Sequence, residues 1–129
     1  MNIKDFTTGV QHIGIPTNDI NKTIEFYHAQ GFETALRTVN GNEEVAFLLL
    51  HNLIIETYQT HQAKMEYGAI DHIAIDVKNI EKLFNVVKEA GTFKMLDQHV
   101  NGLPFWEHGV KFFTIEGPNK EKIEFCEKL

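Results

Sequence analysis

Apolar and polar residues alternate along two similar stretches of the chain, and each stretch predicts a β-strand. Residues 9–16 place their isoleucines on one face of the strand and His12 on the other. Residues 70–77 repeat the arrangement, with the isoleucines again on one face and His72 on the opposite one. The alternation therefore places both histidines away from the apolar face that would join a core.

A helical pattern follows each of these two strands. Ile20, Ile24 and Tyr27 share one face of a helix that we expect to stop at Gly31. The second helix is expected to stop at Gly91, and its apolar face consists of Ile80, Leu83, Phe84 and Val87. Polar residues at the starts of the helices are candidate N-caps: Asn18 or Asp19 for the first and Asn79 for the second.

The rest of each half predicts three more strands. We expect them at residues 32–39, 44–50, 53–59, 93–96, 109–116 and 122–127, with a polar linker at 60–68, a loop at 97–108 and a turn at 117–119. The order βαβββ thus occurs twice. We predict an α+β fold in which two βαβββ modules, about 9–60 and about 69–129, form one curved mixed sheet within a single domain spanning residues 1–129.

A glutamate lies in the last strand of each predicted module. Glu56 follows Leu53-Ile54-Ile55, and Glu124 stands between Ile123 and Phe125. A buried carboxylate without a partner is costly, so a bound cation explains both positions. The alternative is an edge strand whose glutamate faces water. With His12 and His72, these residues predict a metal site of two histidines and two glutamates.

Imidazole nitrogens and carboxylate oxygens suit a divalent ion such as Ni, Zn, Co, Fe or Mn. The donor set contains no thiolate and leaves room for substrate oxygens, which is typical of a catalytic centre. Such an ion would polarise a carbonyl and stabilise an enolate-like intermediate, and one glutamate could act as a general base.

Several aromatic residues are candidates for a small-molecule pocket beside this site. They are Phe47, Phe105, Trp106 and Phe113. Core packing is the competing interpretation for Phe47 and Phe113, and Phe105-Trp106 forms either a lid or a plug of the core. The only cysteine, Cys126, is expected to be a small buried residue, so no internal disulfide is possible.

The net charge of −6 argues against nucleic-acid binding, which needs a basic face. The sequence contains no apolar run long enough for a transmembrane helix and no apolar segment typical of a secretory signal, so we expect a cytoplasmic protein without a membrane partner. Arg37 is the only arginine, which leaves few groups for a bidentate clamp on an anionic substrate.

Taken in order along the chain, these motifs resemble the vicinal oxygen chelate superfamily, the glyoxalase I and bleomycin-resistance-like proteins. The resemblance rests on His12-Ile13-Gly14-Ile15, Ile24-Glu25-Phe26-Tyr27, Ile55-Glu56, Asp71-His72-Ile73-Ala74 and Gly117-Pro118-Asn119-Lys120 leading to Ile123-Glu124-Phe125. It implies that His12, Glu56, His72 and Glu124 match the four metal positions of bacterial glyoxalase I-like enzymes, and that Glu124 shuttles the proton. It also implies that the curved sheet surrounds this metal site and that the protein is a homodimer. The implied activity is that of a lyase or isomerase that converts the thiohemiacetal of a 2-oxoaldehyde through an enediolate.

The chain departs from the glyoxalase I-like pattern at Pro16. Those enzymes usually carry an arginine there, four residues after the first histidine, where it helps to hold glutathione. The phrase around His12 is equally similar to methylmalonyl-CoA epimerases, which use the same scaffold. An epimerase of this kind and a small-molecule-binding or resistance protein are therefore the alternative functions.

Overall fold

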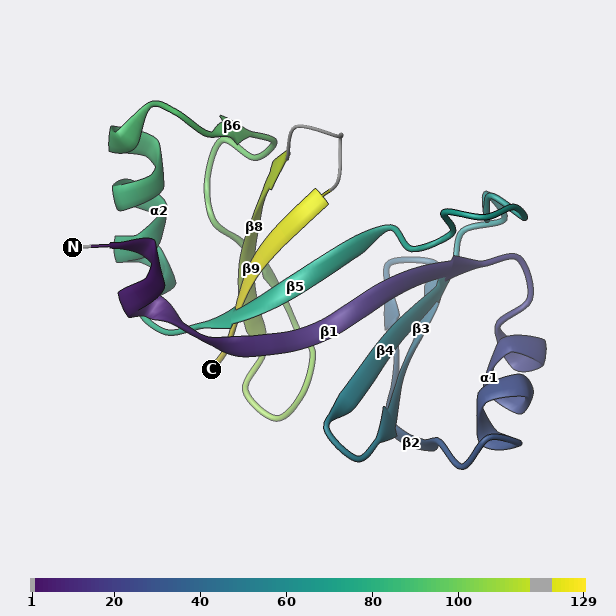
Figure 1. Cartoon of the computed structure of the whole chain (residues 1–129). Coiled ribbons are helices and arrows are strands. Elements are labelled where there is room, and N and C mark those ends of the chain that lie inside the picture. The colour runs from purple at the N-terminus through teal and green to yellow at the C-terminus, as the bar shows by residue number, and fades with distance from the viewer. Residues whose placement is uncertain (1, 117–121) are drawn as a thin grey trace. The chain divides into compact units, whose positions relative to one another are not determined.

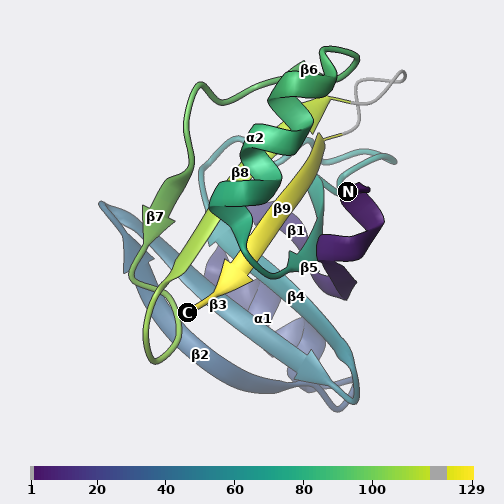
Figure 2. The same ribbon diagram turned by 90° about the vertical axis from the view of Figure 1, so that its left-hand side faces the viewer.

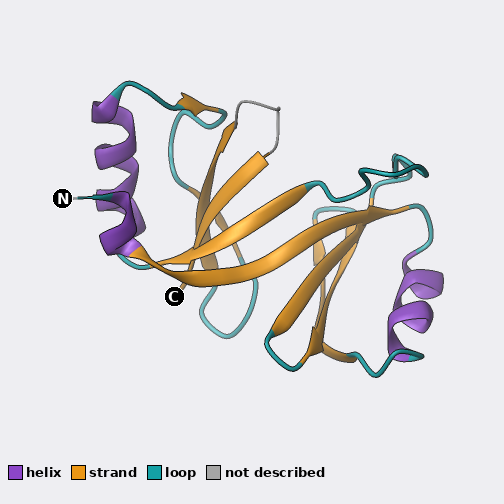
Figure 3. Cartoon of the chain, in the orientation of Figure 1, coloured by secondary structure: helices purple, strands orange, loops and turns teal. Residues whose placement is uncertain are grey.

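In the computed structural model of the chain, residues 2–116 and 122–129 are described, and the turn expected at 117–119 lies outside them. The described residues form two α-helices, one short 3₁₀ helix and nine strands, which confirms the predicted α+β class (Figure 3). In chain order the elements are η1 (Ile3–Phe6), β1 (Thr7–Thr17), α1 (Ile20–His28), β2 (Glu33–Asn40), β3 (Glu43–Leu50), β4 (Leu53–Gln59), β5 (His72–Val77), α2 (Ile80–Ala90), β6 (Lys94–Met95), β7 (Asn101–Leu103), β8 (Val110–Glu116) and β9 (Lys122–Lys128). No helix of these described ranges is long and apolar enough to cross a membrane.

The chain divides into two compact units, and strand β1 takes part in both (Figure 1). We call His12–Asp71 the central unit, and Met1–Gln11 together with His72–Leu129 the terminal unit. Hydrogen-bonded strands follow the order β2-β3-β4-β1 in the central unit and β1-β5-β9-β8-β6 in the terminal unit, where β7 also pairs with β8. The pairs β1/β4 and β5/β9 are parallel, whereas β2/β3, β3/β4, β8/β9 and the short pairs of β6 and β7 with β8 are antiparallel.

In the central unit, helix α1 covers one face of the sheet. Asp19 caps it, because its side chain accepts a hydrogen bond from the backbone N–H of Lys22 at 3.1 Å. Of the two predicted caps, the structure therefore selects Asp19. Ile20 and Ile24 then turn inward and pack in a core with strand residues that include Leu48 and Ile55.

In the terminal unit, helix α2 lies across β8 and β9 (Figure 2). Its Leu83 and Phe84 pack with Phe113 and Phe125 in the core. Phe6, from the start of the chain, belongs to the same core and is only 3% exposed. The N-terminal residues therefore pack with the second half of the sequence. The alternation pattern did not predict η1, the short helix that contains Phe6.

Helix α2 begins at the predicted residue but is capped in another way. Asn79 has a left-handed backbone (φ +54°), and its side chain makes no capping hydrogen bond. The carboxylate of Glu127 in β9 accepts from the backbone N–H groups of Asn79 (3.3 Å) and Ile80 (3.0 Å). The expected Asn79 side-chain cap is therefore wrong, because a glutamate distant in sequence already satisfies these donors.

Several boundaries differ from the predictions. Helix α1 ends at His28, before the expected stop at Gly31, and β1 begins at Thr7 rather than at residue 9. Strand β5 begins at His72 rather than at residue 70, and β7 (Asn101–Leu103) lies inside the loop expected at 97–108. Residues 60–71 contain no helix or strand, as expected for a linker at 60–68.

Candidate metal centre

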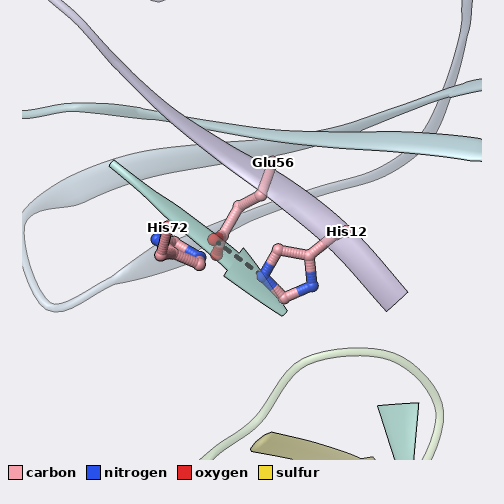
Figure 4. A group of neighbouring side chains, drawn as sticks. All are labelled: His12, Glu56 and His72. Atoms are coloured by element: carbon pink, nitrogen blue, oxygen red, sulfur yellow. Dashed lines mark ion pairs between the residues drawn. The ribbon is translucent and has the colours of Figure 1, made fainter. Parts of the chain in front are cut away.

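The central unit holds the first histidine beside the first glutamate. In the parallel pair of β1 and β4, Gly14 stands directly opposite Glu56, so His12 lies two residues earlier on the same face as Gly14. The distance between His12 Nε2 and Glu56 Oε1 is 3.3 Å, marked by the dashed line in Figure 4. The two side chains are 5% and 12% exposed, so this polar pair is almost wholly withdrawn from water.

The terminal unit repeats the arrangement with the second histidine and glutamate. Ala74 of β5 stands opposite Glu124 of β9, and His72 again lies two residues earlier. His72 Nε2 is 3.9 Å from Glu124 Oε1, and the side chains are 10% and 14% exposed. The two halves of the chain therefore build the same His–Glu pair from the same parallel register.

Small residues stand directly opposite both glutamates. Gly14 and Ala74 occupy equivalent positions, two residues after a histidine and directly opposite a glutamate. Both residues are buried. A larger side chain at either position would stand between the glutamate and the histidine, because directly opposed side chains of neighbouring strands lie close together.

The two glutamates differ in their neighbours on the other side. Phe47 of β3 stands opposite Glu56, and its ring meets the His12 ring edge to face with centroids 5.7 Å apart. Thr114 of β8 stands opposite Glu124. The first pair is thus backed by an aromatic ring and the second by a hydroxyl group.

The donors of these pairs fit a divalent ion. Each pair offers an imidazole nitrogen and a carboxylate oxygen, the combination that zinc, nickel, cobalt, iron and manganese accept. A carboxylate and an imidazole withdrawn from water cost free energy unless they are paired or bound to a cation. Two imidazole–carboxylate pairs largely withdrawn from water are therefore expected in a metal centre and not in a purely apolar binding face.

Comparison with known proteins identifies the family. Residues 9–125 match the model of the Glyoxalase/Bleomycin resistance protein/Dioxygenase superfamily. The chain belongs to this superfamily.

Similar proteins match nearly the whole chain. An uncharacterized protein of Bacillus subtilis (strain 168), YwbC, is 29% identical over 126 residues, which span 92% of this chain and 97% of that protein. The crystal structure of hypothetical protein BH1468 from Bacillus halodurans C-125 is 26% identical, with a TM-score of 0.70 and coverage of 93% and 94%. A methylmalonyl-CoA epimerase in complex with methylmalonyl-CoA and NH4+ has the same fold, with a TM-score of 0.76 at 19% identity and 95% coverage of both chains.

The four candidate pocket residues of this superfamily member lie in different surroundings. Phe47 is buried beside His12, as described above. Phe105 is 4% exposed, and the neighbouring Trp106 is half-buried with Lys128 Nζ 4.1 Å from its ring centroid. Phe113 packs against Phe84 and Phe125 in the core, on the face of β8 opposite to Thr114. For Phe113 this position favours core packing, the competing interpretation.

The remaining charged or ligating residues lie elsewhere on the chain. Arg37 donates to Asn21 and Glu44 and pairs in register with Ala46, a core residue on the α1 side of the central unit. The other five histidines are exposed: His28, His51, His61, His99 and His108. Cys126 is buried at 2% exposure, as expected.

The sequence pattern did not single out Thr114. Its place opposite Glu124 follows only from the register of β8 and β9, which lie on either side of the predicted turn at 117–119. Alternation along β8 places Thr114 and Glu116 on one face, but it does not say which residue of β9 each one meets.

Proposed function

We propose that this protein is a metal-dependent lyase or isomerase of the glyoxalase I type, with one divalent ion held by His12, Glu56, His72 and Glu124. Its substrate is the thiohemiacetal of a 2-oxoaldehyde. The observation that supports the proposal most is the repeated His–Glu pair, because it gives two imidazoles and two carboxylates from equivalent positions of the two halves. The proposal includes a single domain over residues 1–129 that works as a homodimer.

Proton transfer is the chemistry that these residues would perform. When bound, the metal supplies a Lewis acid that polarises the substrate carbonyl and stabilises the charge of the enediolate. Glu124 takes the proton from one carbon and returns it to the next, since a carboxylate can serve as base and then as acid. Phe47, Phe105 and Trp106 would exclude water and contact the apolar part of the substrate.

A methylmalonyl-CoA epimerase-like activity is the second candidate. Arg37 is held by Asn21 and Glu44 on the α1 side, so the only arginine is not on the His12–Glu56 face. The chain therefore offers no arginine there for the carboxylates of glutathione. An epimerase needs the same proton transfer next to a carbonyl, and a protein of this kind shares the fold.

Metal content tests the proposed centre. The wild-type protein is expected to hold about one divalent ion per chain after dialysis, because four donors of this kind satisfy one ion. His72→Ala should lose most of this metal. His28→Ala should keep it, because His28 is exposed and is hydrogen-bonded to Thr34. Equal trace metal in the wild type and in His72→Ala would contradict the proposal.

Turnover then separates the two candidates. The metal-loaded protein is given methylglyoxal with a series of thiols and, separately, an acyl-CoA in deuterated water. Thioester formation supports the glyoxalase I type of reaction. Deuterium incorporation at the carbon next to the thioester carbonyl, without any thiol-dependent reaction, supports the epimerase instead.

A further inference from the structure

The hydroxyl group of Thr114 lies beside Glu124 in the terminal unit. The two residues are directly opposed in the antiparallel pair of β8 and β9, so their side chains project from the same face. Thr114 Oγ1 has no hydrogen-bond partner among the described residues. It is therefore available to a neighbouring carboxylate.

The backbone of Thr114 brings the two side chains still closer. Its N–H donates to Asp97 Oδ2 at 2.7 Å, and its carbonyl accepts from Leu96 N–H at 2.9 Å. Both peptide groups thus point away from β9, which makes Thr114 and Glu124 a non-hydrogen-bonded pair. In such pairs the Cα atoms are about 4.5 Å apart, against about 5.5 Å in the hydrogen-bonded pairs, so the side chains approach each other closely.

The equivalent position in the central unit carries no hydroxyl group. Phe47 stands opposite Glu56 and lies edge to face with His12, so an aromatic ring covers that glutamate. A ring cannot donate a hydrogen bond to a carboxylate in this position, whereas a threonine hydroxyl can. The two otherwise equivalent glutamates therefore have different means of being oriented.

We propose that Thr114 is a positioning residue for Glu124. In the metal-bound protein its hydroxyl donates a hydrogen bond to a carboxylate oxygen of Glu124, a bond that the described residues do not form here, and so aims Glu124 at both the ion and the substrate proton. The inference rests on the proposed function, and it explains why Glu124 and not Glu56 is the glutamate that moves the proton. Asp97 and Leu96 support the arrangement by fixing the backbone of Thr114.

Two substitutions separate the hydroxyl group from the shape of the side chain. Thr114→Val keeps the branched shape and loses the hydroxyl, and Thr114→Ser keeps the hydroxyl and loses the methyl group. We measure the dissociation constant for Mn²⁺ by equilibrium dialysis, then kcat and KM with the substrate found for the wild type. The valine variant should bind Mn²⁺ roughly 10-fold more weakly and lose kcat with little change in KM, as is typical when a partner of a metal ligand is removed.

The serine variant should keep the wild-type dissociation constant and kcat. If Thr114 acted only through packing of its methyl group, serine would not keep them. Thr57→Val is the matched control, because the Thr57 hydroxyl is buried in the central unit without a partner. It should leave Mn²⁺ binding unchanged.

Each other outcome overturns the inference. If Thr114→Val binds Mn²⁺ as tightly as the wild type, or if serine fails to restore binding, the hydroxyl does not position Glu124, although the metal centre still stands. If the wild type itself binds no Mn²⁺, Zn²⁺ or Ni²⁺, the proposed function fails and the inference fails with it.

Discussion

Single side chains decide whether a histidine and a glutamate on neighbouring strands can meet. Gly14 and Ala74 stand directly opposite Glu56 and Glu124, so neither His–Glu pair has a large side chain beside it at these positions. We expect Gly14→Val to weaken metal binding at least 10-fold, by analogy with other changes beside metal ligands, because its side chain would stand against Glu56. Equilibrium dialysis with Mn²⁺ measures the effect.

The control for this substitution is Ile13→Val, at the preceding residue of β1, which projects from the opposite face. It should bind metal as the wild type does. Wild-type affinity in Gly14→Val would show that the small residue is not needed for the pair.

A buried hydroxyl without a partner provides a second prediction at this scale. Thr57 is fully buried in β4, and no described residue pairs with its Oγ1. Replacing it by valine keeps the shape and removes a desolvated polar group, so the free energy of unfolding should rise by about 1 kcal/mol. Urea denaturation of the two proteins measures the change, and a destabilised Thr57→Val would reveal a hydrogen bond that forms in solution.

At the scale of elements, the start of α2 depends on a glutamate from β9. Glu127 accepts from two N–H groups of the helix and places a negative charge at its positive end. Glu127→Ala should lower the free energy of unfolding by about 1 kcal/mol, as for loss of an N-cap. Asn79→Gly should leave it close to wild type, since glycine adopts the positive φ of this residue without strain. If urea denaturation instead showed that Asn79→Gly is less stable than Glu127→Ala, the cap would belong to Asn79.

Most elements, and the placing of His12, Glu56, His72 and Glu124 on strands, could be predicted because they depend on local patterns. Which histidine meets which glutamate is set by strand register. Alternation set His12 and His72 apart from the isoleucines, and apolar spacing defined α1 and α2. The Glu127 cap and the Thr114–Glu124 pair could not be predicted, because they depend on strand register. Strand β7 was missed because three residues around Gly102 carry no alternation, and its pairing with β8 alone makes it a strand.

At the scale of the whole molecule, the sequence repeat and the compact units do not coincide. The start of the chain packs with the second half: Phe6 lies in the core of α2, β8 and β9, Lys78 N–H donates to its carbonyl at 2.9 Å, and Thr8 Oγ1 donates to Asp76 at 2.7 Å. A division of the protein at the linker would therefore remove core residues from the terminal unit.

We expect Phe6→Ala to destabilise the terminal unit by about 3–5 kcal/mol, as for other buried phenylalanines. Hydrogen exchange read by mass spectrometry should show lost protection in 80–90 and 110–116, while 43–59 keeps its protection. Ile3→Val, a milder change at the edge of the same core, is the control. Equal loss of protection in both units would show that they unfold as one cooperative body.

The sharing of β1 also bears on the order in which the two units can fold during synthesis. Residues 12–71 form the central unit, so this unit is complete in the nascent chain before residues 72–129 are made. The 3₁₀ helix and the first part of β1 are made earlier still, but they must wait for residues 72–129 before Phe6 is covered. Phe6 therefore emerges before the central unit but is buried after it, and a chaperone that binds nascent chains would find Phe6 exposed until the terminal unit folds.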